Sequence, residues 1–136
     1  MADTSILEKV KRAKRVYIIG NGGSYANAVH IANDLLAVGK PAFTLDPASL
    51  TASANDHGYE TIYSRWLRTV GNRDDLLLAL SGSGCSKNIL EAIKAAQEIG
   101  MDFHLVTDYL RTRDMQQSEE DQLALGHELM KALRCS

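Results

Sequence analysis

The chain has 136 residues, which is the length of one domain. With 45% hydrophobic and 24% charged residues it can bury a core, so the composition excludes disordered and fibrous classes. Lys and Arg together number 15 against 17 Asp and Glu, a balance that argues against a basic nucleic-acid surface or a polybasic membrane arm. We therefore expect a small-molecule ligand, with neither nucleic acid nor membrane as a partner.

The sequence lacks the signals of export or membrane insertion. Its apolar runs, such as residues 76–80, are far shorter than the roughly 20 residues that cross a bilayer. Apolar residues 6 and 7 are followed at once by charged residues, unlike the apolar core of a signal peptide. Cys85 and Cys135 do not form a CxxC pair and are expected to be free thiols. These features predict a cytoplasmic protein.

Short apolar runs bounded by Gly, Asp or Ser alternate with longer stretches of helical period. This alternation is typical of a parallel sheet covered by helices on both faces. We predict an α/β three-layer sandwich with a mostly parallel sheet of four strands. In chain order, the expected elements are helix 4–14, strand 16–20, helix 24–38, strand 42–45, helix 59–70, strand 76–80, helix 87–99, strand 103–107 and helix 118–133.

Two glycine- and serine-rich loops follow expected strands. The glycine loop (residues 20–24) has the sequence Gly-Asn-Gly-Gly-Ser, and the serine loop (residues 81–86) has the sequence Ser-Gly-Ser-Gly-Cys-Ser. Glycines let the backbone approach a ligand closely, and free N–H groups at a helix N-terminus favour an anion. Together the loops predict a phosphate monoester site with Ser81, Ser83 and Ser86. Taken singly, each loop is also compatible with a tight turn that ends in an N-cap serine.

A dinucleotide is the rival ligand. Gly20 and Gly22 open a Rossmann-like fingerprint, and Asp46 after the second strand stands where a ribose-binding acid would. However, Tyr25 occupies the position of the third glycine, and this interpretation gives the serine loop no role. A Walker A pattern is absent from the sequence.

The motifs form an ordered series: the glycine loop, His30 with Asp34, Asn55 with Asp56, the serine loop, and His127 on the last helix. The series, spread over residues 16–129, resembles the SIS (sugar isomerase) domain and, within it, the phosphoheptose isomerases. The resemblance implies an SIS or flavodoxin-like sandwich in which a fifth strand precedes the last helix. It implies one SIS domain over residues 1–136, shortened at the N-terminus and before the last helix, because residues 108–118 offer little apolar sequence for that strand.

The resemblance also implies an activity. Phosphoheptose isomerases interconvert sedoheptulose 7-phosphate and D-glycero-D-manno-heptose 7-phosphate, in lipopolysaccharide precursor biosynthesis, as homodimers or homotetramers with shared active sites. The alternative is a non-catalytic SIS module that binds a phosphosugar or mediates protein assembly. The implied substrate contacts are the phosphate-binding Ser81, Ser83 and Ser86, the sugar-binding Asn21, Gly22 and Ser24, and the hydroxyl-binding Asn55 and Asp56. The chain departs from the family at Gly82, where Thr is common, and at Cys85, where Asn is common.

The resemblance further implies a zinc site at His30, Asp34, Glu119 and His127, in which Asp replaces the usual Glu and Glu replaces the usual Gln. The residues themselves permit such a site without demanding it. His30 and Asp34 are four apart and share a helix face, but Glu119 and His127 are about 80° out of phase. Glu120 is in better phase with His127, and the acidic run 119–121 is also typical of a solvated first turn. Imidazole and carboxylate are suitable zinc ligands.

A ketose-to-aldose isomerisation moves a proton between C1 and C2 through an enediol. It needs a base at carbon and an acid at oxygen, or a metal that polarises the carbonyl. We assign Asp34 as the base and His127 as the group that supplies or recovers the other proton, because histidine exchanges protons readily near neutrality.

Overall fold

A computed structural model describes residues 4–107 and 114–134. Its four described strands form one parallel sheet, as predicted, and they lie in the order β2 (Ala42–Phe43), β1 (Val16–Ile19), β3 (Leu76–Leu80) and β4 (Asp102–Val106). None of the described helices is long and apolar enough to cross a membrane. The elements are α1 (Thr4–Arg12), β1 (Val16–Ile19), α2 (Gly23–Ala37), β2 (Ala42–Phe43), α3 (Pro47–His57), the 3₁₀ turn η1 (Tyr59–Thr61), α4 (Ile62–Val70), β3 (Leu76–Leu80), α5 (Lys87–Ile99), β4 (Asp102–Val106) and α6 (Met115–Arg134).

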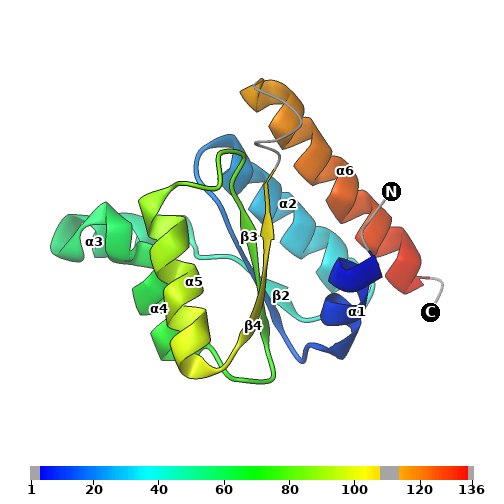
Figure 1. Cartoon of the computed structure of the whole chain (residues 1–136), viewed down its shortest axis with the longest axis horizontal. Helices are drawn as coiled ribbons and strands as arrows, with labels where there is room; N and C mark the ends of the chain where they lie inside the picture. Colours follow the sequence, from blue (N-terminus) through cyan, green and yellow to red (C-terminus); the bar gives the residue numbers. More distant parts are fainter. Residues whose placement is uncertain (1–3, 108–113, 135–136) are drawn as a thin grey trace.

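Helices cover both faces of the sheet, giving the three predicted layers (Figure 1). Alternate residues of β1 point to opposite faces. Val16 and Ile18 join a core with α1, α2 and α6, whereas Tyr17 and Ile19 join a core with α4 and α5. Every residue of β3 is buried, which explains why its sequence is uninterruptedly apolar.

The structure corrects the expected helices in two places. Residues 47–57, for which we predicted no element, form α3; Asp46 caps it by accepting a hydrogen bond from the Ser49 amide (2.9 Å), and Pro47 starts it. The helix expected at 59–70 begins as η1, and α4 proper starts at Ile62. Most of the segment considered for a fifth strand, residues 108–113, lies outside the described residues.

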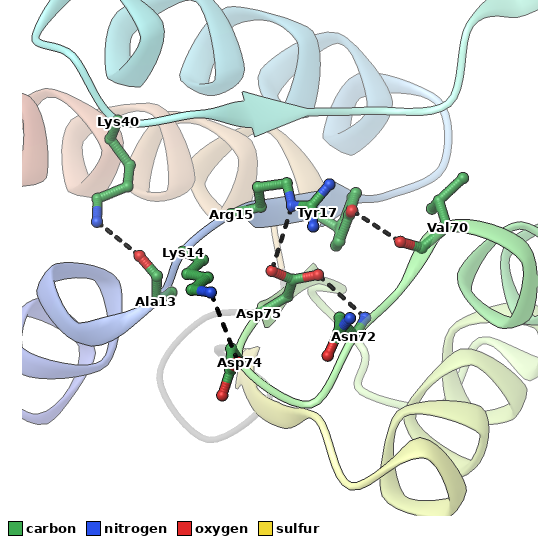
Figure 2. Close-up of polar contacts among 9 residues, drawn as sticks. All are labelled: Ala13, Lys14, Arg15, Tyr17, Lys40, Val70, Asn72, Asp74 and Asp75. Atoms are coloured by element: carbon green, nitrogen blue, oxygen red, sulfur yellow. Dashed lines mark hydrogen bonds and ion pairs between the residues drawn. The ribbon is translucent and has the colours of Figure 1, made fainter.

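Polar contacts fasten the amino edge of the sheet (Figure 2). The buried Asp75 carboxylate accepts a hydrogen bond from the Asn72 amide (3.0 Å) and lies 3.5 Å from Nε of Arg15. Tyr17 donates its hydroxyl to the Val70 carbonyl (3.1 Å), and burial, followed by the nearby Asp75 charge, raises the pKa of Tyr17 and keeps it a donor. These contacts join β1 to the segment before β3. The strand-to-helix loops emerge at the opposite, carboxyl edge.

Candidate functional site

The glycine loop and the serine loop lie side by side at the carboxyl edge of the sheet. They follow β1 and β3, which are neighbouring parallel strands, and both appear at the upper edge of the sheet in Figure 1. β4 ends at the same edge, where Thr107 donates its hydroxyl to the Gly82 carbonyl (3.0 Å). The fold thus brings together the two loops that the sequence singles out.

Side chains from other elements fix the glycine loop. The Tyr63 hydroxyl, from α4, donates to the Gly20 carbonyl (2.6 Å); Tyr63 is fully buried, and this burial raises its pKa. The Asn21 and Asn88 amides bond reciprocally (2.9 and 2.8 Å). Tyr59 donates its hydroxyl to the Asn21 oxygen (2.8 Å). Most of the Asn21 amide is therefore engaged in holding the loop.

The serine loop bonds mainly to itself. The Ser81 hydroxyl accepts the Gly84 amide (3.1 Å), and the Ser83 hydroxyl accepts the Cys85 amide (3.1 Å). A hydroxyl that accepts an N–H keeps its own hydrogen to donate. In the described part of the chain, Ser86 begins α5 without a side-chain capping bond, which leaves amides at that helix start for an anion. The loop can therefore offer several donors to one ligand.

Three of the four predicted metal ligands meet between α2 and α6. Nε2 of His30 lies 3.3 Å from Oδ2 of Asp34, Nε2 of His127 lies 3.6 Å from the same oxygen, and the two nitrogens are 3.3 Å apart. Gly126 allows this approach, because a Cβ there would collide with Ile31 of α2. We call these residues the His–Asp–His group (His30, Asp34 and His127).

The His–Asp–His group fits a zinc ion. Two ligands of a tetrahedral zinc, each about 2.1 Å from the metal, stand about 3.4 Å apart, close to the separations of 3.3, 3.3 and 3.6 Å seen here. Oδ2 of Asp34 is buried and has no hydrogen-bond partner among the described residues, so it is available as a ligand. Both imidazoles are nearly half exposed, which leaves access for a further ligand.

The fourth predicted ligand, Glu119, lies elsewhere. Its carboxylate packs on Gly23, so closely that a Cβ at Gly23 would collide with it. The Asn27 amide holds this turn of α6 by donating to the Glu119 carbonyl (2.7 Å) and to Oε1 of Gln122 (3.0 Å). Ser24 also donates its hydroxyl to Oε1 of Gln122 (3.0 Å). Glu119 and Ser24 therefore belong to the contact between the glycine loop and α6.

The remaining predicted residues lie on or before α3. Asn55 and Asp56 are exposed near its end and hydrogen-bond to each other (3.2 Å). Asp46 caps the start of α3, and the Ser49 amide that it accepts lowers the pKa of its carboxyl. Asp46, the acid that the dinucleotide alternative places at the ribose, therefore serves as the cap of α3 in this fold.

Sequence reasoning missed the residues that hold the glycine loop. Asn88, Tyr63 and Gln122 are polar groups on buried helix faces. The available signal for Asn88 was an amide side chain on the buried face of a helix, two residues after Ser86. Buried amides are normally hydrogen-bonded, so such a residue indicates a partner nearby. The partner could not be inferred, because Asn21 lies 67 residues away along the chain.

Comparison with known proteins gives consistent matches. A family model of the SIS domain matches residues 1–107. The phosphoheptose isomerase of Campylobacter concisus is 40% identical over 109 residues, 74% of this chain and 58% of the relative; that of Cytophaga hutchinsonii is 40% identical over 103 residues, 71% and 54%. The chain therefore spans little more than half the length of these curated relatives.

Solved structures share the fold. A phosphoheptose isomerase from Neisseria gonorrhoeae matches with a TM-score of 0.87 and 27% identity, covering 96% of this chain and 82% of that chain. One from Francisella tularensis matches with a TM-score of 0.87 and 24% identity, covering 98% and 86%.

Proposed function

Because this chain belongs to the SIS domain family, we propose that it is a phosphosugar isomerase that interconverts sedoheptulose 7-phosphate and D-glycero-D-manno-heptose 7-phosphate. The observation that carries the proposal is the convergence of His30, Asp34 and His127 in a fold that also sets the glycine loop beside the serine loop. Relatives named phosphoheptose isomerase, 40% identical to this chain, support the choice of substrate.

The serine loop binds the phosphate. Ser81, Ser83 and Ser86 donate their hydroxyls, and the start of α5 adds its amides and its dipole. The sugar lies across Asn21, Gly22 and Ser24 of the glycine loop, and its outer hydroxyls approach Asn55 and Asp56 at the end of α3. The short serine side chains fit a phosphate ester without a fixed cation.

The His–Asp–His group moves the protons. Asp34 takes the proton from one sugar carbon and returns it to the neighbouring carbon of the enediol, and α2 fixes the position of Asp34 between two imidazoles. His127 supplies or recovers the proton at oxygen, and its half-exposed ring is accessible to the substrate. The group is compatible with a metal site, and we propose that it holds zinc through His30, Asp34 and His127. A bound zinc ion supplies polarisation of the sugar carbonyl.

The site is shared between copies of the chain. His30 and Asp34 lie about two to three helical turns along α2 from Gly23. The same helix exposes Val29 (46%) and Leu36 (51%), which are seven residues apart and share one face. We propose a homodimer or homotetramer in which this face packs against a second copy and brings a His–Asp–His group to a neighbouring pair of loops.

We also propose that residues 1–136 form one SIS domain that works in the cytoplasm. The packing of α6 on α2 extends the unit beyond the residues that the family model matches. The free, exposed thiol of Cys85 suits a reducing compartment.

The test is conversion of sedoheptulose 7-phosphate by the purified chain, with and without added zinc. The proposal expects the aldose product, lost in Asp34→Asn and His127→Ala and kept in Asp74→Asn, a matched exposed carboxylate at the opposite edge of the sheet. Binding without turnover in either condition would replace the isomerase with a non-catalytic phosphosugar module. Absence of binding would contradict both functions.

A further inference from the structure

A groove lies between α3 and α4, on the face of the sheet opposite α2 and α6. Its volume is about 450 Å³, which is within the range of small-molecule sites. Leu45 and Ile62, both buried in the core, form its apolar floor. In Figure 1, α3 stands out from the body of the molecule beside α4 and α5. None of the residues that line the groove belongs to the two loops or to the His–Asp–His group.

Polar side chains of both helices line the groove at regular spacing. Ser49 and Ser53 are four residues apart and share one face of α3. Four residues of α4 lie at the spacing of one helix face, three, four and seven positions after the first. They are Ile62, Arg65, Trp66 and Thr69. A helix face with this spacing usually packs on the core, but this one carries an arginine and a threonine, which suits contact with a polar ligand.

The groove carries positive charge. Arg65 and Arg68 both line it, and none of the described residues that line it is acidic. The Arg68 guanidinium is paired with the Glu98 carboxylate, 2.9 Å away. In contrast, no carboxylate within residues 4–107 and 114–134 pairs with the guanidinium of Arg65, which is exposed. One unpaired cation beside an apolar floor matches a ligand that has a single anionic group.

Trp66 adds an aromatic surface that the core holds in place. Its indole is partly buried and meets the Tyr17 ring nearly perpendicularly, with the ring centroids 5.3 Å apart. An indole, serine hydroxyls and a free guanidinium can pack on a base, hydrogen-bond to a ribose and pair with a phosphate, respectively. We propose that the groove is a second ligand site, which binds a nucleoside monophosphate with its base against Trp66 and its phosphate at Arg65. This site does not depend on the proposed isomerase function.

The fluorescence of Trp66 reports directly on the groove, because the sequence has one tryptophan. The purified chain is titrated with AMP and with UMP, with excitation at the red edge of indole absorption, where the bases absorb little. At least one nucleotide should change the emission saturably. The matching nucleoside, which lacks the phosphate, and ribose 5-phosphate, which lacks the base, should each bind at least about ten-fold more weakly. No change with either nucleotide, or equal binding of nucleotide and nucleoside, overturns the proposal.

Three variants locate the bound nucleotide, with calorimetry as the measurement. Arg65→Gln should weaken binding about ten-fold, the size of one charge-assisted hydrogen bond. Arg12→Gln, the same substitution at an exposed arginine on α1, should leave the affinity unchanged. Ser83→Ala should also leave it unchanged, because the serine loop is a separate site. A loss in Ser83→Ala without a loss in Arg65→Gln would place the nucleotide in the serine loop and overturn the groove site, while the isomerase proposal would stand.

Discussion

The glycine loop and the serine loop share one edge of the sheet but are stabilised in different ways. The glycine loop is held from outside, by Tyr63 on α4, Asn88 on α5 and Gln122 on α6. The serine loop is held mostly from within, by hydroxyls that accept amides two or three residues away. The glycine loop is therefore preorganised by the fold, whereas the serine loop can exchange its internal bonds for bonds to a phosphate.

Because they are held differently, the two loops suit different parts of a ligand. A loop fixed by distant side chains suits a ligand part that must be placed accurately, such as the sugar carbons. A loop of small residues that bonds to itself suits the anionic end, where several donors converge on one charged group. Neither loop contains a carboxylate or an imidazole, so in the proposed reaction we assign proton transfer to the His–Asp–His group.

The largest expected effect is a loss of turnover, and it comes from the His–Asp–His group and not from either loop. Asp34→Asn removes the proposed base while keeping its shape, so turnover of sedoheptulose 7-phosphate should fall about 10²- to 10⁴-fold. Affinity for the sugar ester should change little, because the loops that hold it are intact. Steady-state kinetics and calorimetry on the same preparation check both expectations. A variant that keeps full turnover would remove Asp34 from the reaction.

The next effect concerns the stability of the glycine loop. Tyr63→Phe deletes the donor to the Gly20 carbonyl and leaves that acceptor buried. The free energy of unfolding should fall by about 2 to 3 kcal/mol, measured by urea denaturation. Ser83→Ala, which removes an exposed hydroxyl of the serine loop, should change it by less than about 0.5 kcal/mol. Equal losses in both variants would abolish the distinction between the loops.

The affinity for the ligand should show the opposite order, with a larger loss in Ser83→Ala than in Tyr63→Phe. Ser83→Ala should weaken binding of sedoheptulose 7-phosphate by about 1 to 3 kcal/mol if the hydroxyl donates to the phosphate. Calorimetry at constant salt gives this value. An affinity equal to that of the unaltered chain would show that Ser83 does not contact the phosphate.

The smallest effect is a pH dependence at the cap of α3. The Ser49 amide lowers the pKa of the Asp46 carboxyl below its ordinary value of 3.8, so the cap contributes stability above that value and loses it as the pH falls through the lower, folded pKa. Asp46→Asn keeps a capping side chain without the titration. Unfolding followed at several pH values below 4 should therefore show a shallower loss of stability in Asp46→Asn. Identical slopes would mean that Asp46 does not cap α3 in solution.

The sequence predicts the local features well. β3 and α5 have the expected bounds, since the apolar run and the helical period are strong there. The spacing of His30 and Asp34 places both on one face of α2, as the structure has it. α3 was missed because all of its residues are at least partly exposed, so it has no apolar period.

Contacts between distant segments were the part that the sequence could not predict. Tyr63 reaches Gly20 across 43 residues, and Ser24 reaches Gln122 across 98. Glu119 was expected at the metal site from resemblance, but its position depends on how α6 docks on Gly23 and Asn27. Helical phase restricts such contacts without specifying which partner lies across the interface.

Backbone amide NMR of the zinc-free chain, titrated with sedoheptulose 7-phosphate, tests most directly where the ester binds. The largest shifts are expected at the amides of residues 82–86, with smaller ones at residues 21–24 and none at the amino edge around Asp75. Binding of the ester without shifts at residues 82–86 would contradict the proposal that the serine loop holds the phosphate.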